Sequence, residues 1–427
     1  MEQESPKKKT KVVRLRCSVQ NYDWGIVGKA SQVARLCSLN SGSGIVHHPH
    51  KPYAEFWVGT HESGPSFVVR SRENGGLVGS ESVSLQSWIL ENPDVLGDKV
   101  LKKWGCDLPF LFKVLSVEKA LSIQAHPDKK LARALNKSQP SIYRDDNHKP
   151  EMALALTEFE ALCGFITRKE LEGVLCTVPE IVDLIGGADA EEFLHVNEQL
   201  GNEKVNAVLA SIFTQLMSSS KDAIHDVIFK LKRRLNKEKE TRQLTDKEQL
   251  VLRLESQYPG DVGVVAAFFL NYVKLNRGEA LYLGANEPHA YICGECIECM
   301  ATSDNVVRAG LTSKHRDTQT LLSMLTYRQV SAAVFPEILR GVPLNLYTTR
   351  YLPPFDEFEV DRCILPKAAS VVFPAVPGPS LFLFIAGKGM INAGCFEEDV
   401  IEEGEVLFVP AYTEISITAC INSVTLV

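Results

Sequence analysis

Several side chains that can bind a metal ion or a polar ligand occur in the short β-like segment LSIQAHPDKK. Ser122, Gln124 and His126 alternate there with the apolar residues Ile123 and Ala125. Successive side chains of a strand point to opposite faces, so the hydroxyl, the amide and the imidazole would share one face. A polar triple on the inner face of a strand is a candidate for ligand binding.

Two further segments each supply one ligand candidate. Glu151 ends a polar run immediately before an apolar segment, which places its carboxylate at the mouth of a strand, and His289 follows a proline-containing turn at the start of another strand. Together with the Gln124 oxygen and His126 they make two imidazoles, one carboxylate and one amide. This set suits Zn²⁺ with one position left for water or substrate. The alternative is that the histidines are buried and satisfied by hydrogen bonds alone.

Cationic side chains lie close in sequence to these ligand candidates. Lys149 precedes Glu151, and Arg308 and Lys314 follow His289 beside glycine-containing turns. Guanidinium and ammonium groups near a metal favour an anionic ligand such as a phosphate ester. The chain as a whole is acidic, with 46 Lys and Arg against 53 Asp and Glu, so this local concentration of cations is informative.

The cysteines of the segment YICGECIECMA have the spacing C-x2-C-x2-C, which occurs in iron–sulfur proteins. We reject that interpretation, because no fourth cysteine followed by proline is nearby. On a strand Cys293 and Cys299 would face the side opposite Cys296, so three packed thiols are the better account. Glu298 shares the side of Cys296 and is an acidic residue in an otherwise apolar strand.

The elements that must position these residues change along the chain. Residues 13–162 contain short β-branched and aromatic runs broken by Gly, Pro, Asn and Ser, which predicts β structure. Over 163–259 apolar residues recur every three or four positions, which predicts helices. β structure resumes over 260–333 and continues over 334–427. We therefore expect a catalytic barrel formed by 13–162 and 260–333, an inserted helical domain, and a C-terminal barrel.

Two β segments align with each other without gaps. GEALYLGANEPHAYI begins at Gly278, and GEVLFVPAYTEISIT begins at Gly404. A repeated unit of this kind predicts two related β-barrels. Ile415 takes the place of His289 in the second copy, so the C-terminal barrel should hold no metal.

The composition is that of an ordinary folded protein. The chain has 427 residues, of which 45% are apolar and 23% charged, and a length of roughly 150 residues per domain predicts about three domains. A net charge of -7 offers no basic field for a polyanion, so we expect no nucleic-acid partner. No run of about 18 apolar residues occurs, so we expect no membrane association.

Location and assembly can be predicted only from what the sequence lacks. The N-terminus is polar and basic without an apolar signal core, and the 11 cysteines are spread thinly, so we expect a cytoplasmic protein with reduced thiols. The basic run PKKKTKV resembles a nuclear-localisation signal, but we interpret residues 1–12 as a solvated tail. Because no coiled-coil heptad run is present, we expect a monomer.

Five segments carry a resemblance to a known family. YRDDNHKPE (143–151) and HAYICGECIECMATSDNVVRAGLTSK (289–314) closely resemble the signatures of type I mannose-6-phosphate isomerases, zinc-dependent enzymes of the cupin superfamily. QNYDWG (20–25), AEFWVGTH (54–61) and LSIQAHPDK (121–129) also resemble segments of that family. The resemblance extends from near the N-terminus to at least Arg316, and it implies a mainly β fold with two cupin-type jelly-roll barrels and a helical insertion.

The resemblance also implies roles for individual residues. It implies one Zn²⁺ per chain, held by Gln124, His126, Glu151 and His289. The catalytic residues that it implies are Arg308, Lys113, Glu298 and Asp304. Contacts with the sugar phosphate would come from Ser122, Lys149, Lys314 and Tyr291. Ser313 departs from the family, which usually has proline there, and this departure leaves the placement of Lys314 open.

The implied reaction converts D-mannose 6-phosphate into D-fructose 6-phosphate and back, and supplies mannose phosphate for mannosylation precursors such as GDP-mannose. It needs ring opening, a proton moved between neighbouring carbons through an enediol, and a cation near the negative oxygens. Glu298, Lys113 and a zinc-bound water are the candidates for the base. An Fe(II) cupin oxygenase is an alternative, because two histidines and a carboxylate can form a facial triad, but the fourth ligand Gln124 argues against it. A cupin that only stores or senses sugar phosphate is a further alternative.

Overall fold

The computed structural model describes residues 11–43, 48–69, 83–195, 202–331, 337–393, 398–420 and 422–427. The predicted basic tail, residues 1–12, lies outside these ranges except for Lys11 and Val12. The chain divides into two compact units: one comprises 1–116, 296–302 and 340–427, the other 117–295 and 303–339. Among the helices of the described ranges, none combines the length and apolar character needed to cross a membrane.

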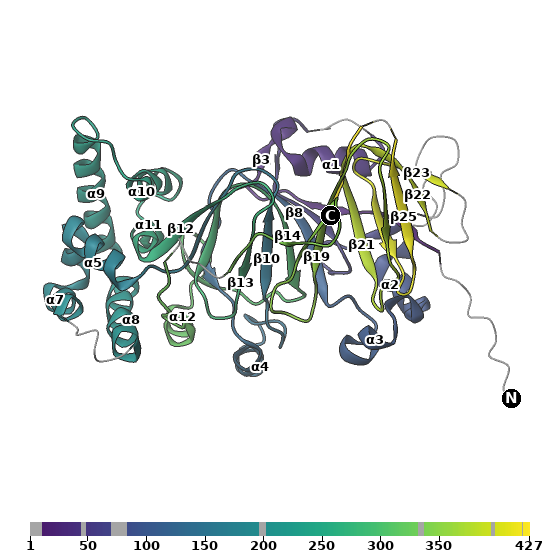
Figure 1. Cartoon of the computed structure of the whole chain (residues 1–427). Coiled ribbons are helices and arrows are strands. Elements are labelled where there is room, and N and C mark those ends of the chain that lie inside the picture. Colours follow the sequence, from purple (N-terminus) through teal and green to yellow (C-terminus); the bar gives the residue numbers. More distant parts are fainter. Residues whose placement is uncertain are drawn as a thin grey trace. The chain divides into compact units, whose positions relative to one another are not determined.

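The second unit contains two antiparallel ladders of strands (Figure 1). One has the order β10-β13-β16. The other has the order β12-β11-β14-β9-β15. The strands are β9 (Ile123–Ala125), β10 (Glu151–Ala155), β11 (Phe159–Phe165), β12 (Leu270–Leu275), β13 (Ala280–Leu283), β14 (His289–Ala301), β15 (Val307–Gly310) and β16 (Ile338–Leu339). Only the first part of β14 belongs to this unit.

Strand β10 shows how a charged residue comes to lie in a buried sheet. Its sequence is EMALA and every residue of it is buried. The small and apolar side chains account for this burial on both faces of the strand. The only charge, Glu151, is the first residue of the strand, so its carboxylate lies at the end of the ladder rather than in the middle.

Helices fill the part of the chain between β11 and β12. They are α5 (Arg168–Thr177), α6 (Pro179–Ile185), α7 (Gly187–His195), α8 (Asn202–Ser218), α9 (Lys221–Glu238), α10 (Asp246–Gln257), α11 (Val262–Ala266) and η4 (Ala267–Phe269). Thr167 and Thr245 are the N-cap residues of α5 and α10, and each forms a complete capping box. The threonine side chain accepts from the backbone N–H of the glutamate three residues later, and that glutamate side chain accepts from the threonine N–H. The prediction of a helical insertion is confirmed.

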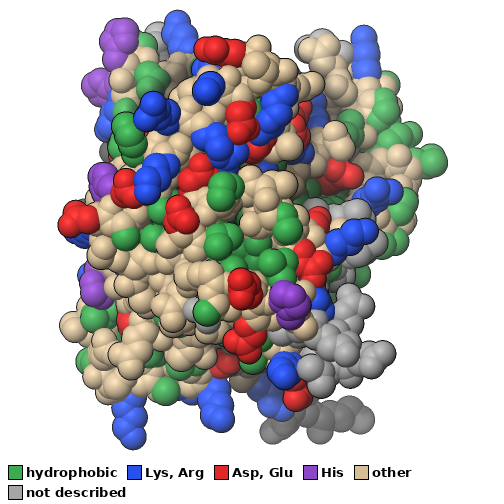
Figure 2. All heavy atoms as spheres, turned by 90° about the vertical axis from the view of Figure 1, so that its left-hand side faces the viewer, with side chains coloured by type: hydrophobic (Ala, Val, Ile, Leu, Met, Phe, Trp, Pro, Cys, Tyr) green, Lys and Arg blue, Asp and Glu red, His purple; other side chains and the backbone are tan. Residues whose placement is uncertain are grey.

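These helices share one core with the strands of their own unit. On α9 the residues Ile224, Val227, Ile228, Leu231 and Leu235 are buried, following the three- and four-residue spacing of the sequence. On the neighbouring α8, Phe213 meets Phe165 of β11 edge to face, with ring centroids 5.2 Å apart. Figure 2 shows the outer face of the helical side, where Lys, Arg, Asp and Glu side chains are interspersed. The same unit also contains α4 (Lys129–Ser138) and α12 (Thr318–Met324).

The first unit is built mainly from strands. Its largest sheet has the order β17-β18-β19-β26-β21-β24-β1-β6-β7, its second has the order β20-β25-β22-β23, and β2, β5, β8 and the last part of β14 form a third ladder. The strands of the largest sheet are β1 (Val13–Arg16), β6 (Phe67–Val69), β7 (Val83–Ser84), β17 (Val342–Pro343), β18 (Thr348–Tyr351), β19 (Val360–Leu365), β21 (Ser380–Ala386), β24 (Val406–Val409) and β26 (Val424–Leu426).

The remaining elements of this unit are shorter or connect the sheets. The other strands are β2 (Ser18–Gln20), β3 (Ile26–Val27), β4 (Pro52–Tyr53), β5 (Glu55–Val58), β8 (Phe110–Val117), β20 (Ser370–Phe373), β22 (Lys388–Asn392), β23 (Asp399–Glu402) and β25 (Ile415–Ala419). The helices are η1 (Gly28–Ala30), α1 (Gln32–Asn40), α2 (Leu85–Glu91), η2 (Pro93–Leu96) and α3 (Asp98–Trp104). β3 and β4 pair with each other.

The two aligned segments of the sequence have the same local structure. Gly278 and Gly404 have φ angles of 90° and 83°, and a strand of four residues begins two positions later in each. Asn286 and Tyr412, which occupy the same position of the repeat, have φ angles of 63° and 60°. The next strand begins at His289 in one copy and at the buried Ile415 in the other. The repeat is therefore structural as well as sequential.

The sheets differ from the predicted barrels in one respect. The described sheets do not close: the nine-stranded sheet of the first unit, for example, ends at β7 and β17, two strands of two residues each. Such short strands limit further pairing at a sheet edge. The prediction of closed barrels is therefore wrong, whereas the prediction of a sheet-rich chain with a helical insertion is confirmed.

Candidate active site

Three buried side chains of the second unit converge on one point. The Nε2 atoms of His126 and His289 each lie 3.4 Å from a different carboxylate oxygen of Glu151. One donor atom from each residue lies within 4.8 Å of the others, and all three residues are at most 1% exposed. Both Nε2 atoms and Glu151 Oε2 are buried without a hydrogen-bond partner. Because burying unsatisfied polar atoms is costly, this arrangement fits a bound cation.

Backbone carbonyls orient both imidazoles. The Nδ1–H of His126 donates to the carbonyl oxygen of Asn305 at 2.7 Å, and that of His289 donates to the carbonyl oxygen of Glu287 at 3.1 Å. With Nδ1 protonated, the lone pair of each neutral ring is on Nε2, which faces Glu151. Metal-binding histidines in proteins are usually oriented in this way.

The charge of Glu151 is balanced within the site. Lys149 Nζ lies 3.1 Å from Glu151 Oε1. Burial is the largest influence and pushes the pKa of Glu151 upward, but the Lys149 ammonium together with His126 and His289 outweighs burial and holds that pKa well below its ordinary value. Burial lowers the pKa of His126 to about 4. At neutral pH the site therefore offers one carboxylate and neutral imidazole, the protonation states that a metal ion requires.

Strand pairing places Gln124 between two other site residues. Gln124 of β9 is directly opposite His289 of β14 on one side and directly opposite Arg308 of β15 on the other. Residues opposite each other in antiparallel strands point to the same face, so the three side chains are neighbours on one face of the ladder. The Ser122 hydroxyl donates to Gln124 Oε1 at 3.3 Å, from the same face.

The remaining predicted residues of this unit lie at different depths. Arg308 is half-buried, its guanidinium makes no hydrogen bond or ion pair with any described residue, and burial lowers its pKa. Lys314 and Asp304 are exposed, and Tyr291 is buried two residues along β14 from His289. A half-buried guanidinium without a carboxylate partner is suited to bind an anion.

Asp145, which sequence reasoning missed, joins the two signature segments. Its carboxylate accepts hydrogen bonds from the Ser303 hydroxyl and from the backbone N–H of Asp304, both at 2.8 Å. The Asn305 amide donates to the backbone and side-chain oxygens of Asp145 at 2.9 and 3.1 Å. Asp145 thus fixes Asn305, whose carbonyl orients His126. In the sequence, the only indication that Asp145 has a role is that it lies in one of two polar signature runs.

Asn286, also missed, makes the corresponding link on the other side. Its backbone N–H donates to the carbonyl of His126 at 2.8 Å, and its side chain exchanges hydrogen bonds with Asp128 at 3.2 and 3.1 Å. The turn that precedes His289 is therefore tied to the turn that follows His126. Asparagine is one of the few residues that adopt the left-handed conformation seen here without large strain.

Lys113 and Glu298 lie in the first unit and contact each other. Lys113 Nζ is 2.9 Å from Glu298 Oε2 and 3.4 Å from Glu55 Oε2. Trp57 donates from Nε1 to Glu55 at 2.5 Å, and its ring centroid lies 5.0 Å from Lys113 Nζ. All four residues are buried, so this is a second polar group inside a largely apolar core.

The cysteine run holds no metal-ligand cluster among the described residues. Cys293, Cys296 and Cys299 are free thiols, and the last two are buried. Burial raises the pKa of Cys293 and of Cys299, which keeps these groups protonated. Cys296 and Cys299 are packed thiols as expected, whereas Cys293 is only partly buried.

The fold and the site together define a class of protein. Its members are built from sheets with a helical insertion and have a buried His-Glu-His site that could hold a metal ion. Two family models match the chain: phosphomannose isomerase type I, catalytic domain, over residues 12–168, and the helical insertion domain of the same family over residues 184–270. Mannose-6-phosphate isomerase 2 of Arabidopsis thaliana is 58% identical over 407 residues, which cover 95% of this chain and 90% of that protein. Mannose-6-phosphate isomerase of Schizosaccharomyces pombe is 39% identical over 95% of this chain and 96% of that protein.

Solved structures agree with these relatives. A mutant of phosphomannose isomerase from Salmonella typhimurium superposes with a TM-score of 0.80 at 27% identity, covering 98% of this chain and 99% of that one. A mannose 6-phosphate isomerase bound with zinc and yttrium superposes with a TM-score of 0.79 at 26% identity, with the same coverage. The chain belongs to the type I phosphomannose isomerase family and is an isomerase.

Proposed function

We propose that this chain interconverts D-mannose 6-phosphate and D-fructose 6-phosphate and binds one Zn²⁺. The observation that carries the proposal is the buried triad of His126, Glu151 and His289, with Arg308 next to Gln124 on the same strand ladder. The names of the relatives, mannose-6-phosphate isomerase, support the substrate. The zinc-bound relative supports the metal.

The donor set fits zinc. Two imidazole nitrogens and a carboxylate oxygen are its common protein ligands, and the amide oxygen of Gln124 would be the fourth. When bound, zinc would polarise or orient oxygen atoms of the sugar without any redox change. Asp145 and Asn286 would hold the ligand segments in place: Asp145 fixes Asn305, whose carbonyl orients His126, and Asn286 ties the turn before His289 to the carbonyl of His126.

The other residues would bind the substrate and move the proton. Arg308 would stabilise the negative charge that develops on the sugar oxygens as the proton moves between C1 and C2 through an enediol. Lys113 and Glu298, which lie 2.9 Å apart, stay candidates for the base. Asp304 would contact the sugar, and the substrate contacts would come from Ser122, Lys149, Lys314 and Tyr291, with Ser122 and Lys314 at the phosphate.

The remaining predictions from sequence complete the proposal. We propose that the β regions are cupin-type jelly-roll sandwiches rather than closed barrels. The domains would be 13–162 with 260–333 as the catalytic domain, 163–259 as the helical domain and 334–427 as a domain without metal. The enzyme would act as a cytoplasmic monomer and supply mannose phosphate for mannosylation precursors.

A coupled assay tests the proposal directly. Purified protein is given mannose 6-phosphate, and formation of fructose 6-phosphate is followed before chelation, after chelation and after Zn²⁺ is restored. We expect turnover that chelation abolishes and Zn²⁺ restores, whereas zinc-loaded protein without turnover would refute the function.

Two variants test the fourth ligand in the same assay. Gln124→Leu should retain zinc less well than wild type. Gln139→Leu, at an exposed glutamine after α4, should retain zinc normally. Equal retention in the two variants would argue against Gln124 as a ligand.

A further inference from the structure

The turn that carries Lys314 has a backbone conformation that contacts with other parts of the chain must stabilise. It begins after β15 at Leu311, which is buried and has a φ angle of 54°. A bulky residue such as leucine adopts this left-handed conformation only when the surrounding structure imposes it. Within the turn, the backbone N–H of Lys314 donates to the Thr312 hydroxyl at 3.0 Å, while the lysine side chain is exposed.

The carboxylate of Asp261 supplies that support. Its Oδ1 accepts a hydrogen bond from the backbone N–H of Leu311 at 2.6 Å, and its Oδ2 accepts one from Thr312 at 3.3 Å. Oδ1 also accepts from the N–H of Gly263 at 2.7 Å and so caps α11. One side chain thus satisfies donors of both the turn and the helix, and hydrogen bonds to a carboxylate are among the stronger ones.

The backbones of α11 and the end of β15 are also in close contact. A Cβ atom built on Gly310 would lie 2.6 Å from the Gly263 backbone, and one built on Gly263 would lie 2.5 Å from the Leu311 nitrogen. Glycine at both positions allows this approach. Because the two backbones are so close, a small shift of α11 would move the turn.

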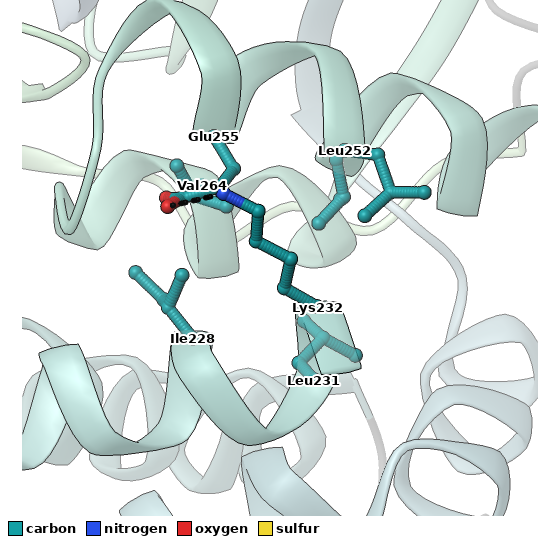
Figure 3. A pocket seen from close by; sticks show the side chains of 7 residues that line it. Ile228, Leu231, Lys232, Leu252, Glu255 and Val264 are labelled. Atoms are coloured by element: carbon teal, nitrogen blue, oxygen red, sulfur yellow. Dashed lines mark ion pairs between the residues drawn. The ribbon is translucent and has the colours of Figure 1, made fainter. Parts of the chain in front are cut away.

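The helical insertion holds α11 in place. Val264 of α11 packs near Ile228 and Leu231 of α9 and Leu252 of α10, and Lys232 and Glu255 form a 3.6 Å ion pair at the same place (Figure 3). The end of α10 and the connection to α11 also contact Ala120, two residues before Ser122 in the segment that leads into β9. Gln257 accepts from the N–H of Ala120 at 3.1 Å, and the Tyr258 hydroxyl donates to the Ala120 carbonyl at 2.5 Å.

We infer that Asp261 is a positioning residue for the phosphate group of the substrate, acting through the turn that carries Lys314. The inference rests on the proposed function, in which Lys314 and Ser122 contact the phosphate. It also links the helical domain to the phosphate, because the end of α10 and the connection to α11 hold the two segments that would bind the phosphate.

Asp261→Ser separates this role from helix capping. Serine can still cap α11, but its side chain is too short to reach Leu311 and Thr312 as well. We expect KM for mannose 6-phosphate and the inhibition constant of inorganic phosphate to rise about tenfold or more, since small misplacements of a binding group are costly. kcat should change by less than about threefold, and zinc content should stay at the wild-type level.

A matched control and a double variant test whether Asp261 affects phosphate binding through the turn that carries Lys314. Thr245→Ala removes the cap of α10 and should leave KM and the phosphate constant unchanged. In a Lys314→Ala background, Asp261→Ser should add no further loss of phosphate affinity, because both changes remove the same contact. Fully additive losses would overturn the inference.

Further outcomes are decisive as well. Folded Asp261→Ser with wild-type KM and phosphate affinity would overturn the inference. If that variant does not fold, Asp261→Asn, which keeps one acceptor oxygen, should show a smaller rise in KM, and no rise would overturn it. Binding of inorganic phosphate is measured by calorimetry in parallel. Absence of isomerase activity would refute the proposed function, whereas the phosphate affinity of the variants would still decide the role of Asp261.

Discussion

At the scale of single residues, the metal site depends on groups that do not themselves face the metal position. The imidazoles of His126 and His289 are oriented by the carbonyl oxygens of Asn305 and Glu287. Asn305 is in turn fixed by Asp145. Outer partners of this kind affect metal affinity nearly as strongly as ligands do.

Asp145→Ala should therefore weaken zinc binding although Asp145 is not a proposed ligand. Loss of its hydrogen bonds frees the Ser303–Asn305 turn, and we expect zinc affinity to fall about 10- to 100-fold. Competition with a chelator of known affinity measures this change. Asp146→Ala, at the exposed next residue, is the control and should bind zinc as wild type does. Equal affinity in both variants would show that the turn is held by other contacts.

Arg308→Ala should impair turnover without affecting the metal. The guanidinium is half-buried and has no anionic partner among the described residues, as expected of a group that binds the substrate. Removing one preorganised charge at a transition state typically lowers kcat by about 10²–10³. Steady-state kinetics and zinc analysis on the same sample test this, with exposed Arg133→Ala as the control. Wild-type kcat in Arg308→Ala would exclude the assigned role.

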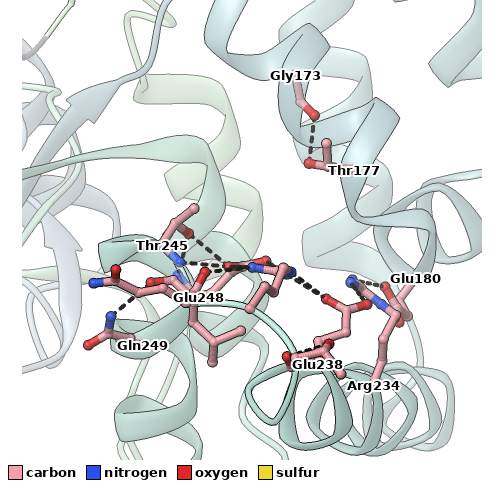
Figure 4. A network of polar contacts seen from close by, with 12 residues as sticks. Gly173, Thr177, Glu180, Arg234, Glu238, Thr245, Glu248 and Gln249 are labelled. Atoms are coloured by element: carbon pink, nitrogen blue, oxygen red, sulfur yellow. Dashed lines mark hydrogen bonds and ion pairs between the residues drawn. The ribbon is translucent and has the colours of Figure 1, made fainter.

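At the scale of elements, an ion-pair network joins helices of the insertion (Figure 4). Arg234 of α9 binds Glu180 of α6 at 2.7 and 2.8 Å, and it also binds Glu238 at 3.1 Å. Arg242 continues the network from Glu238 to Glu248 of α10, which it binds at 2.8 and 2.6 Å. Paired, two-point contacts of this kind fix the relative orientation of the helices.

This network predicts acid sensitivity of the insertion. Hydrogen bonds from Arg242 lower the pKa of Glu248 from its ordinary 4.5 to about 2. A carboxyl group with a lowered folded-state pKa stabilises the fold above pH 4.5, and this stabilisation is lost as the pH falls towards 2. Because the pair is partly exposed, we expect a contribution of only about 1 kcal/mol.

Glu248→Gln tests that contribution. Urea unfolding should show the variant about 1 kcal/mol less stable than wild type at pH 6, with the difference shrinking below pH 4.5. Exposed Glu240→Gln is the control and should unfold like wild type at both pH values. A difference that stays constant with pH would mean that the charge of Glu248 is not its cause.

At the scale of the whole molecule, sequence reasoning succeeded where local pattern decides structure. The helical insertion follows from apolar periodicity and capping residues, and the repeat predicted the paired turns at Gly278 and Gly404. The family followed from long motifs, and the comparisons confirm it. The alternation of residues in the segment around β9 predicted that Gln124 would share a face with Ser122 and His126, and strand pairing places Gln124 directly opposite His289.

Features set by distant pairing or by backbone groups could not be predicted. Strand β1 pairs with β24, about four hundred residues later, and nothing in VRLR specifies that partner. The carbonyl of Asn305 and the left-handed backbone of Leu311 have no signature in residue type. Whether a sheet closes depends on its edge strands, and those of the nine-stranded sheet, β7 and β17, are only two residues long.

The most direct test is anomalous diffraction at the zinc edge from crystals of the zinc-loaded protein. We expect one peak per chain, at about 2.0–2.2 Å from Nε2 of His126, Nε2 of His289 and the carboxylate of Glu151, with the Gln124 oxygen completing the shell. A peak elsewhere, or an active crystal with no peak between these side chains, would contradict the account.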